Sequence, residues 1–249
     1  MCEFPEMKFS WKRPSEIPYT NVWHRFDTKP AQNGAIFKVR IQDLPLGRID
    51  EAVEFMTKYF IADEGLRKAV NFTEDEVSVK CQQYMMATVM KEKMTLIAVL
   101  DEDINNQEII GVQMYSVISK QDPSLPKVFP GKAREKMDQV FSALQGNFNP
   151  LEYFRTNAYL YDWGISVASN FRGLGVGFQL MDSIKWLAKA VNISLVVIRC
   201  NCLEAQISAE KMGCKKYREL RYSDCKDENG ETVCLVEGTE SISIHALTL

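Results

Sequence analysis

Residues 165–177 read Ile-Ser-Val-Ala-Ser-Asn-Phe-Arg-Gly-Leu-Gly-Val-Gly, and this stretch decides the fold. A predicted strand ends at Val167, and apolar residues at helical spacing predict a helix over residues 174–191. Glycines at such a turn leave backbone N–H groups open to a ligand, and the helix N-terminus adds about half a positive charge. Arg172 adds a full charge with a fork of donors. The stretch therefore predicts a site for phosphates.

Three other interpretations of the glycine turn compete with this one. A nucleoside-triphosphate loop requires Gly-Lys-Ser/Thr, but Gly177 is followed by Phe178. A dinucleotide site requires a third glycine at another offset, an early strand and an acid after the next strand, where this chain has Arg199. A glycine-rich helix start that binds nothing stays open, but Arg172 and the preceding strand argue against it.

The flanking sequence predicts a mixed α/β layer with hairpins and helical crossovers. Four prolines mark residues 1–34 as an irregular lead-in, and a polar turn over residues 101–107 joins two strands into a hairpin. We find no repeat and no linker, so residues 1–249 are expected to form one domain. The expected strands are 35–41, 94–100, 109–119, 157–167, 194–199, 215–222 and 232–244, and the expected helices are 49–60, 74–90, 132–144, 174–191 and 202–212.

Composition narrows the class of protein. The net charge of -3 and the pI of about 5.6 give no basic field for nucleic acid or an anionic membrane. No run approaches the length of a membrane span, and the first residues lack an apolar signal stretch. Seven cysteines with two histidines, and a Cys200/Cys202 spacing unlike a zinc pair, predict reduced thiols and no metal. A cytoplasmic, monomeric protein is expected.

Three passages resemble the GCN5-related N-acetyltransferase (GNAT) superfamily. Arg-x-x-Gly-x-Gly at residues 172–177, between a strand and a helix, is similar to its acetyl-CoA signature. Residues 59–66, which include Asp63-Glu64, and residues 209–213 are similar to the insect arylalkylamine N-acetyltransferase family. The resemblance covers roughly residues 35–245. It implies a GNAT fold, in which a twisted, mostly antiparallel sheet splays at the acetyl-CoA strand and is flanked by helices.

The resemblance also implies a cofactor site. The strand before the glycine turn pairs through its main chain with the pantetheine arm, and the turn binds the pyrophosphate. Asn201 stands where the family often has a serine, and it can offer only a hydrogen bond. The implied acetyl-CoA residues are Ile165, Ser166, Val167, Arg172, Gly173, Leu174, Gly175, Val176, Gly177 and Asn201.

The resemblance makes Glu64 the general base. Amide formation from a thioester needs an uncharged amine, so a base must remove a proton from the alkylammonium form. Glu64 follows the aromatic pair Tyr59-Phe60, and aromatic walls favour a raised carboxyl pKa. The residues alone favour a solvated acidic helix end for Asp63-Glu64, and the resemblance reverses this interpretation. Gly65 replaces the usual proline of the family, and Ala209 stands where the superfamily often has a tyrosine acid, so no side-chain acid is named.

The expected reaction is direct acetyl transfer, in a ternary complex, to a primary arylalkylamine such as dopamine, tyramine, octopamine or serotonin. A polyamine or agmatine-like acceptor is the enzymatic alternative, and a non-catalytic acyl-CoA-binding module is the other. An acyl-cysteine route through Cys200 or Cys202 is less favoured, because no histidine lies close in the sequence.

Overall fold

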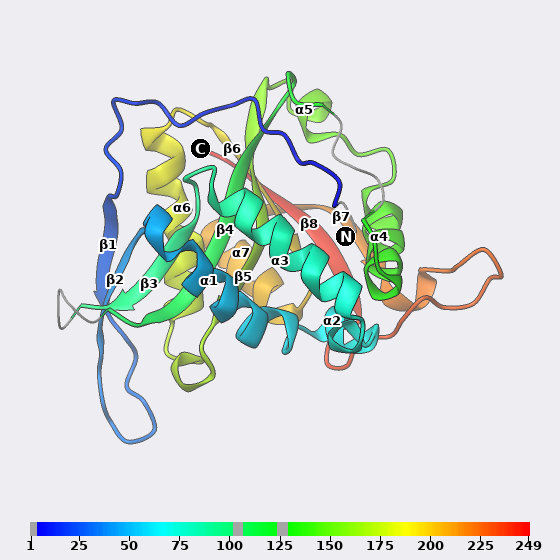
Figure 1. Cartoon of the computed structure of the whole chain (residues 1–249), viewed down its shortest axis with the longest axis horizontal. Coiled ribbons are helices and arrows are strands. Elements are labelled where there is room, and N and C mark those ends of the chain that lie inside the picture. The colour runs from blue at the N-terminus through cyan, green and yellow to red at the C-terminus, as the bar shows by residue number, and fades with distance from the viewer. Residues whose placement is uncertain (1–3, 102–106, 124–128) are drawn as a thin grey trace.

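The computed structural model describes residues 4–101, 107–123 and 129–249, which build one eight-stranded sheet (Figure 1). The strand order is β1-β2-β3-β4-β5-β6-β8-β7, and every neighbouring pair is antiparallel except β5–β6. The strands are β1 (Val22–Asp27), β2 (Lys38–Asp43), β3 (Leu96–Leu100), β4 (Ile109–Ser119), β5 (Ala158–Val167), β6 (Leu195–Cys200), β7 (Lys215–Arg221) and β8 (Ser241–Thr248).

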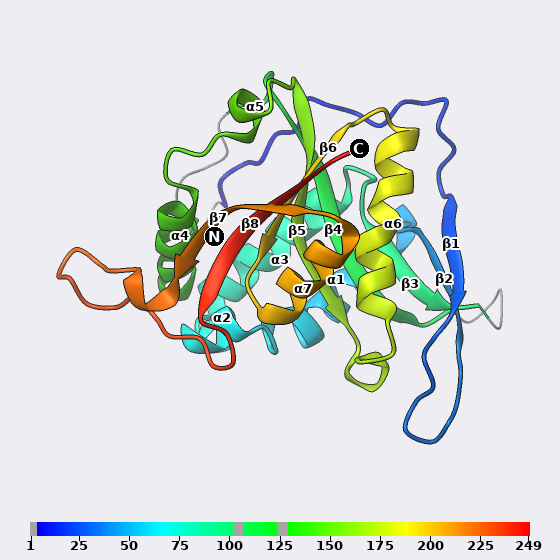
Figure 2. The same ribbon diagram turned by 180° about the vertical axis from the view of Figure 1, so that it is seen from behind.

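Helices cover both faces of the sheet. Helices α1 and α3 lie over the face seen in Figure 1, and α6 and α7 lie over the face seen in Figure 2. Leu180, Ile184 and Leu187 of α6 are fully buried, as the helical spacing of this stretch predicts. The helices are α1 (Ile49–Met56), α2 (Gly65–Ala69), α3 (Glu76–Met90), α4 (Lys132–Gln145), α5 (Pro150–Tyr153), α6 (Val176–Ala190) and α7 (Leu203–Met212). None of the helices described is long and apolar enough to cross a membrane.

The sheet splays between β5 and β6. Their parallel pairing is limited to Leu160–Val196 and Tyr161–Val197, whereas β5 stays paired with β4 as far as Val167. A bulge inserts Trp163 as an extra residue in β5, and bulges bend the strand that carries them. The end of β5 therefore presents a free main-chain edge, as the GNAT resemblance implies.

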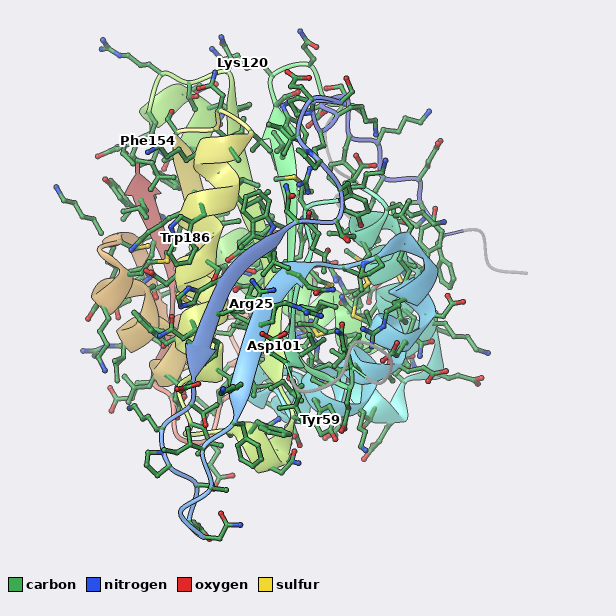
Figure 3. All side chains as sticks on the ribbon, turned by 90° about the vertical axis from the view of Figure 1, so that its left-hand side faces the viewer. Arg25, Tyr59, Asp101, Lys120, Phe154 and Trp186 are labelled. Atoms are coloured by element: carbon green, nitrogen blue, oxygen red, sulfur yellow. The ribbon has the colours of Figure 1, made fainter. Side chains whose placement is uncertain are left out.

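The expectation of an irregular lead-in is wrong for residues 22–27, which form the edge strand β1. Its alternation is masked by polar residues, because the strand is paired on one side only and half-exposed. Arg25 of β1 donates to Asp101 at the end of β3 over 2.9 Å, and the two side chains face each other in Figure 3. Residues 102–106 of the expected hairpin turn lie outside the described residues.

The strand expected over residues 232–244 is also placed wrongly. Strand β8 begins only at Ser241, and the preceding residues form a loop that contains Gly238 at φ 73°. The short helices α2 and α5 were not expected, since neither is long enough to show helical periodicity. The other expected elements are confirmed within a few residues at each end.

Candidate functional site

A cleft of about 930 Å³ opens where β5 leaves β6. Five segments line it: the end of the first helical stretch with α2, the end of β5, the start of α6, the start of α7, and the loop before β8. Its walls include residues 59–69, 165–167, 172–181, 202–208 and 235–239 in part. The sequence-predicted residues Glu64, Ile165, Ser166, Val167, Arg172 and Gly177 all line this cleft.

The glycine turn forms an open cradle at the N-terminus of α6. Gly173 and Gly175 adopt φ of 77° and 93°, and a Cβ on either would meet no atom within 4 Å. Gly175 is the N-cap of α6, so the N–H groups of the first turn have no acceptor within the helix. Leu174 and Val176 turn their side chains into the core. These residues can therefore offer only backbone donors to an anion.

Arg172 does not point freely into the cradle. Its Nε donates to the Val167 carbonyl over 2.9 Å, and its Nη2 donates to Asp63 over 2.9 Å and to the Tyr59 carbonyl over 3.3 Å. The guanidinium thereby ties the end of β5 to the turn before α2. Its charge stays beside the cleft, but the donors that the glycine turn leaves free are backbone N–H groups.

Three successive β5 residues carry the free strand edge along the cleft. Ile165, Ser166 and Val167 pair with β4 on one side and meet no strand on the other within the described part of the chain. Ser166 turns its hydroxyl away and donates to the Tyr59 carbonyl over 2.8 Å. The edge is thus free for an amide-bearing ligand such as pantetheine.

Glu64 lies at the bottom of the cleft and caps α2. Its carboxylate accepts from the N–H groups of Leu66 and Arg67 over 3.1 Å each. It also pairs with the Arg67 guanidinium over 2.8 Å, with both side chains largely buried. Burial lowers the pKa of Arg67 to about 10. Glu64 therefore lies beside the expected aromatic residues and also beside the positive charge of Arg67. The sequence did not predict this ion pair.

A π-helical turn over Thr57–Ile61 delivers the two aromatics to the site. Phe60 packs on β5 at Gly164, whose φ is 138°, and a Cβ there would approach the Phe60 ring to 2.3 Å. The Arg67 guanidinium carbon lies 4.0 Å from the centre of the same ring. The turn, the strand and the base candidate are thus packed as one unit.

Asn201 does not join the cleft. It is half-buried, its carbonyl accepts from the Tyr222 hydroxyl over 2.9 Å, and its Oδ1 has no partner among the described residues. Neighbouring α7 instead contributes Cys202, Ala205 and Ser208. Ser208 lies one turn beyond Glu204, so the two share a face of α7, a spacing that the sequence could have revealed.

The two thiols near the cleft are protonated. Burial raises the pKa of Cys202 to about 11 and that of Cys200 well above its ordinary range. A thiol in that state is a poor nucleophile, which agrees with direct transfer. Within the ranges described, no group of His, Cys, Asp and Glu is arranged to hold a metal ion.

The sequence analysis did not single out Asp162, a buried carboxyl in β5 near the point where β5 and β6 separate. Asp162 is almost fully buried beside the bulge and accepts from the Gly164 N–H over 3.0 Å. Desolvation raises its pKa to about 7. The Tyr115 hydroxyl is buried without a hydrogen-bond partner in the described chain, and the buried Gln113 side chain lies close enough to Asp162 to lower its pKa.

A second cavity of about 610 Å³ lies on the other side of the Glu64–Arg67 pair. Tyr159, Tyr161 and Trp163 of β5 line it, two to six residues before the cleft residues of the same strand. Arg134 and Phe141 of α4 and Arg199 of β6 lie in the remaining walls, together with Phe129 and Phe148 from the segments on either side of α4. The two cavities are therefore neighbours along β5.

Comparison with known proteins was made by sequence and by structure. No protein-family model matches the chain, and no curated protein sequence matches it. Among solved structures, a protein described as arylalkylamine N-acetyltransferase 7 from the yellow fever mosquito Aedes aegypti superposes with a TM-score of 0.86. That match is 23% identical and covers 96% of this chain and 99% of the other.

Two further solved structures resemble the chain over most of its length. Arylalkylamine N-acetyltransferase 2 from Aedes aegypti has a TM-score of 0.77 at 21% identity, covering 84% of this chain and 98% of the other. The polyamine N-acetyltransferase of Drosophila melanogaster, described as forming N-acetylagmatine, has a TM-score of 0.70 at 16% identity, covering 85% and 100%. The chain therefore has the fold of the GNAT superfamily, and the insect arylalkylamine N-acetyltransferases are among the proteins that share it.

Proposed function

We propose that this chain is an acetyl-CoA-dependent N-acetyltransferase that transfers the acetyl group directly to a primary aromatic amine. The observation that carries the proposal is the cleft, where a free β5 edge leads to an open glycine cradle at the start of α6. An extended amide arm fits the strand edge, and a pyrophosphate fits the helix N-terminus. The fold that the chain shares with the insect N-acetyltransferases supports the same function.

The reaction follows from the groups beside the strand. The amine nitrogen bonds to the thioester carbonyl carbon, the carbon–sulfur bond breaks, and the CoA thiolate leaves. Glu64 takes the ammonium proton, directly or through water, so that the nitrogen lone pair is free to attack. No acidic side chain is assigned to the thiolate, which can take its proton from solvent. Thus Glu64 acts as the base, and the β5 edge and the cradle hold the donor in place.

The acceptor proposal rests on the second cavity. Its rings at Phe141, Tyr161 and Trp163 can pack against an aromatic amine of the tyramine, dopamine, octopamine or serotonin kind. Arg134 and Arg199 in the same walls would repel a second positive charge on a polyamine or agmatine. The cavity therefore favours an aromatic acceptor over a polycationic one.

Thiol release from acetyl-CoA tests the function. Purified protein is mixed with acetyl-CoA and either tyramine or spermidine, and free CoA is measured. Turnover with tyramine is expected. Turnover with spermidine alone contradicts the acceptor class, and CoA binding without turnover on any amine indicates a non-catalytic module.

Substitution of Glu64 tests the base. Glu64→Gln should lower kcat/KM by about 10²-fold and remove the fall in rate on the acid side of the pH profile. Glu204→Gln, which also removes a carboxylate from the cleft wall, is the matched control and should leave both unchanged. An unaltered acid limb in Glu64→Gln would take Glu64 out of the mechanism.

A further inference from the structure

The second cavity has an excess of positive charge. Arg67, Arg134 and Arg199 line it, and Asp138 is the one carboxylate among its described lining residues. The three guanidinium groups are close enough for Arg134 and Arg199 to disfavour the charged form of Arg67. Three cations facing one cavity are costly to desolvate unless an anion shares it. Protein carboxylates supply part of that charge.

Two of the three arginines form ion pairs with carboxylates of the described residues, and the third does not. Glu64 pairs with Arg67 over 2.8 Å, and Asp138 pairs with Arg134 over 2.8 Å. In the described chain Arg199 has no ion pair or hydrogen bond to its guanidinium. The Nε of Arg67, a residue that is 4% exposed, is also buried without an acceptor. The cavity thus contains unused donors, and among the described residues the charge of Arg199 is met only without contact, by the buried Asp162, whose desolvation-raised pKa it lowers.

Aromatic stacking fixes where those donors point. The Arg199 guanidinium carbon lies 3.5 Å from the centre of the Phe141 ring and 5.8 Å from that of Tyr161. A guanidinium that rests its face on a ring keeps its N–H groups in the plane of the fork, free to bind a planar anion with two parallel hydrogen bonds. A carboxylate matches this arrangement, and its flanking rings suit an aromatic body.

The position of Arg199 along β5 sets the length of the ligand. Arg199 adjoins Tyr161, four residues before Ile165 at the cleft, which is roughly 13 Å of strand at about 3.3 Å per residue. An α-amino acid carries its amine and carboxylate on one carbon, so it cannot span this length of β5 from Arg199 to the cleft. An amine separated from its carboxylate by an aromatic ring can.

We propose that the acceptor is a primary arylalkylamine whose ring ends in a carboxylate, with the amine at Glu64 and the carboxylate on the Arg199 guanidinium. This inference rests on the proposed function for the site of reaction, and it adds the anionic group that the acceptor carries.

Matched acceptors test the proposal. Acetylation of 4-(2-aminoethyl)benzoate, tyramine and tyrosine is measured in wild type and in Arg199→Gln. Wild type should show a kcat/KM at least about 10-fold higher for the benzoate than for tyramine, because a charge-assisted hydrogen-bond pair is added. Arg199→Gln should lose that preference, so that its kcat/KM for the benzoate falls by about 10-fold relative to its kcat/KM for tyramine. Arg199→Lys should restore part of it, and Arg221→Gln, an exposed arginine on β7, should change nothing.

A binding measurement tests the carboxylate site at Arg199 separately from the proposed N-acetyltransferase function. The affinity of 4-(2-aminoethyl)benzoate is measured by calorimetry in wild type and Arg199→Gln without acetyl-CoA, so the result does not depend on turnover. Weaker binding in the variant by about 10-fold or more supports the carboxylate site even if no amine is acetylated. Equal binding, a preference for tyramine, or a preference for tyrosine overturns it, whereas turnover of tyramine alone leaves the N-acetyltransferase function intact.

Discussion

At the scale of single residues, Gly177 separates cofactor binding from folding. It lies in the first turn of α6, and a Cβ there would meet Val167 at 3.6 Å, an ordinary contact. Gly177→Ala should therefore leave the melting temperature unchanged or slightly higher, since alanine favours helix by up to about 1 kcal/mol. The added methyl would occupy the cleft wall and should weaken CoA binding by about 10-fold or more.

Calorimetry with CoA checks this expectation. Gly47→Ala is the matched control, because a Cβ at Gly47 meets no atom within 4 Å and the residue is remote from the cleft. Gly175 is a poorer choice, since its φ of 93° strains any side chain. Unchanged CoA affinity in Gly177→Ala would show that the pyrophosphate binds elsewhere.

Asp162 predicts a pH dependence of stability. Its pKa of about 7 in the folded protein exceeds its ordinary 3.8, so the folded state binds this proton more tightly than the unfolded state. The contribution of Asp162 to the free energy of unfolding is complete below about pH 4 and decreases as the pH rises toward 7. Above pH 7 the contribution is absent. Asp162→Asn should therefore raise the free energy of unfolding at pH 8 by a few kcal/mol, at about 1.4 kcal/mol per pKa unit.

Urea unfolding at pH 4.5 and pH 8 measures this difference. The gain from Asp162→Asn should be large at pH 8 and small at pH 4.5. A gain that is the same at both pH values would show that the side-chain amide, and not the removed charge, is responsible.

At the scale of elements, strand β5 and the π-helical turn depend on each other through Gly164. Gly164→Ala places a Cβ against the Phe60 ring and forces a side chain onto φ 138°, so it should destabilise the fold by at least about 1–3 kcal/mol. Glu64 follows Phe60 by one turn, so kcat should fall as well. Thermal unfolding and acetylation rates check both effects. Gly164→Ala with Phe60→Leu should recover part of the stability, and no recovery would place the strain in the backbone alone.

The elements also show how far the sequence predicts this molecule. The apolar period of α6 and the glycine turn before it predicted the cradle, because both are local patterns. Edge strand β1 did not show in the pattern, since pairing on one side leaves a strand half-polar. Arg67 and Arg199 lie 132 positions apart in the chain, and only the fold, which brings α2 and β6 to the walls of one cavity, reveals that they share it.

At the scale of the whole molecule, the segment over residues 4–20 crosses the sheet and packs on the acceptor side (Figure 1). Phe9 is buried and meets the Trp163 ring edge-on at 6.3 Å, while the Trp163 indole donates to the Ser116 hydroxyl over 2.8 Å. Phe9→Ala should cost about 3 kcal/mol of stability. It should also raise the KM for the amine more than the KM for acetyl-CoA, because Trp163 lines only the acceptor cavity.

Steady-state kinetics with each substrate varied in turn check this, beside urea unfolding. Phe4→Ala serves as the control, since Phe4 stacks on Tyr84 of α3 and lines neither cavity. Equal changes in the two KM values would mean that Phe9 acts on stability alone.

The same crossing segment constrains the order of events during synthesis. Ser10 donates hydrogen bonds to Asp122, 112 positions later, and Phe9 packs against Trp163, which comes later still in the chain. This segment precedes β4 and β5 in the chain and therefore gains its docking surface only after both strands have been made. Until then Met7 and Phe9 stay uncovered, so the support that Phe9 gives to Trp163 in the wall of the second cavity is among the last contacts to form.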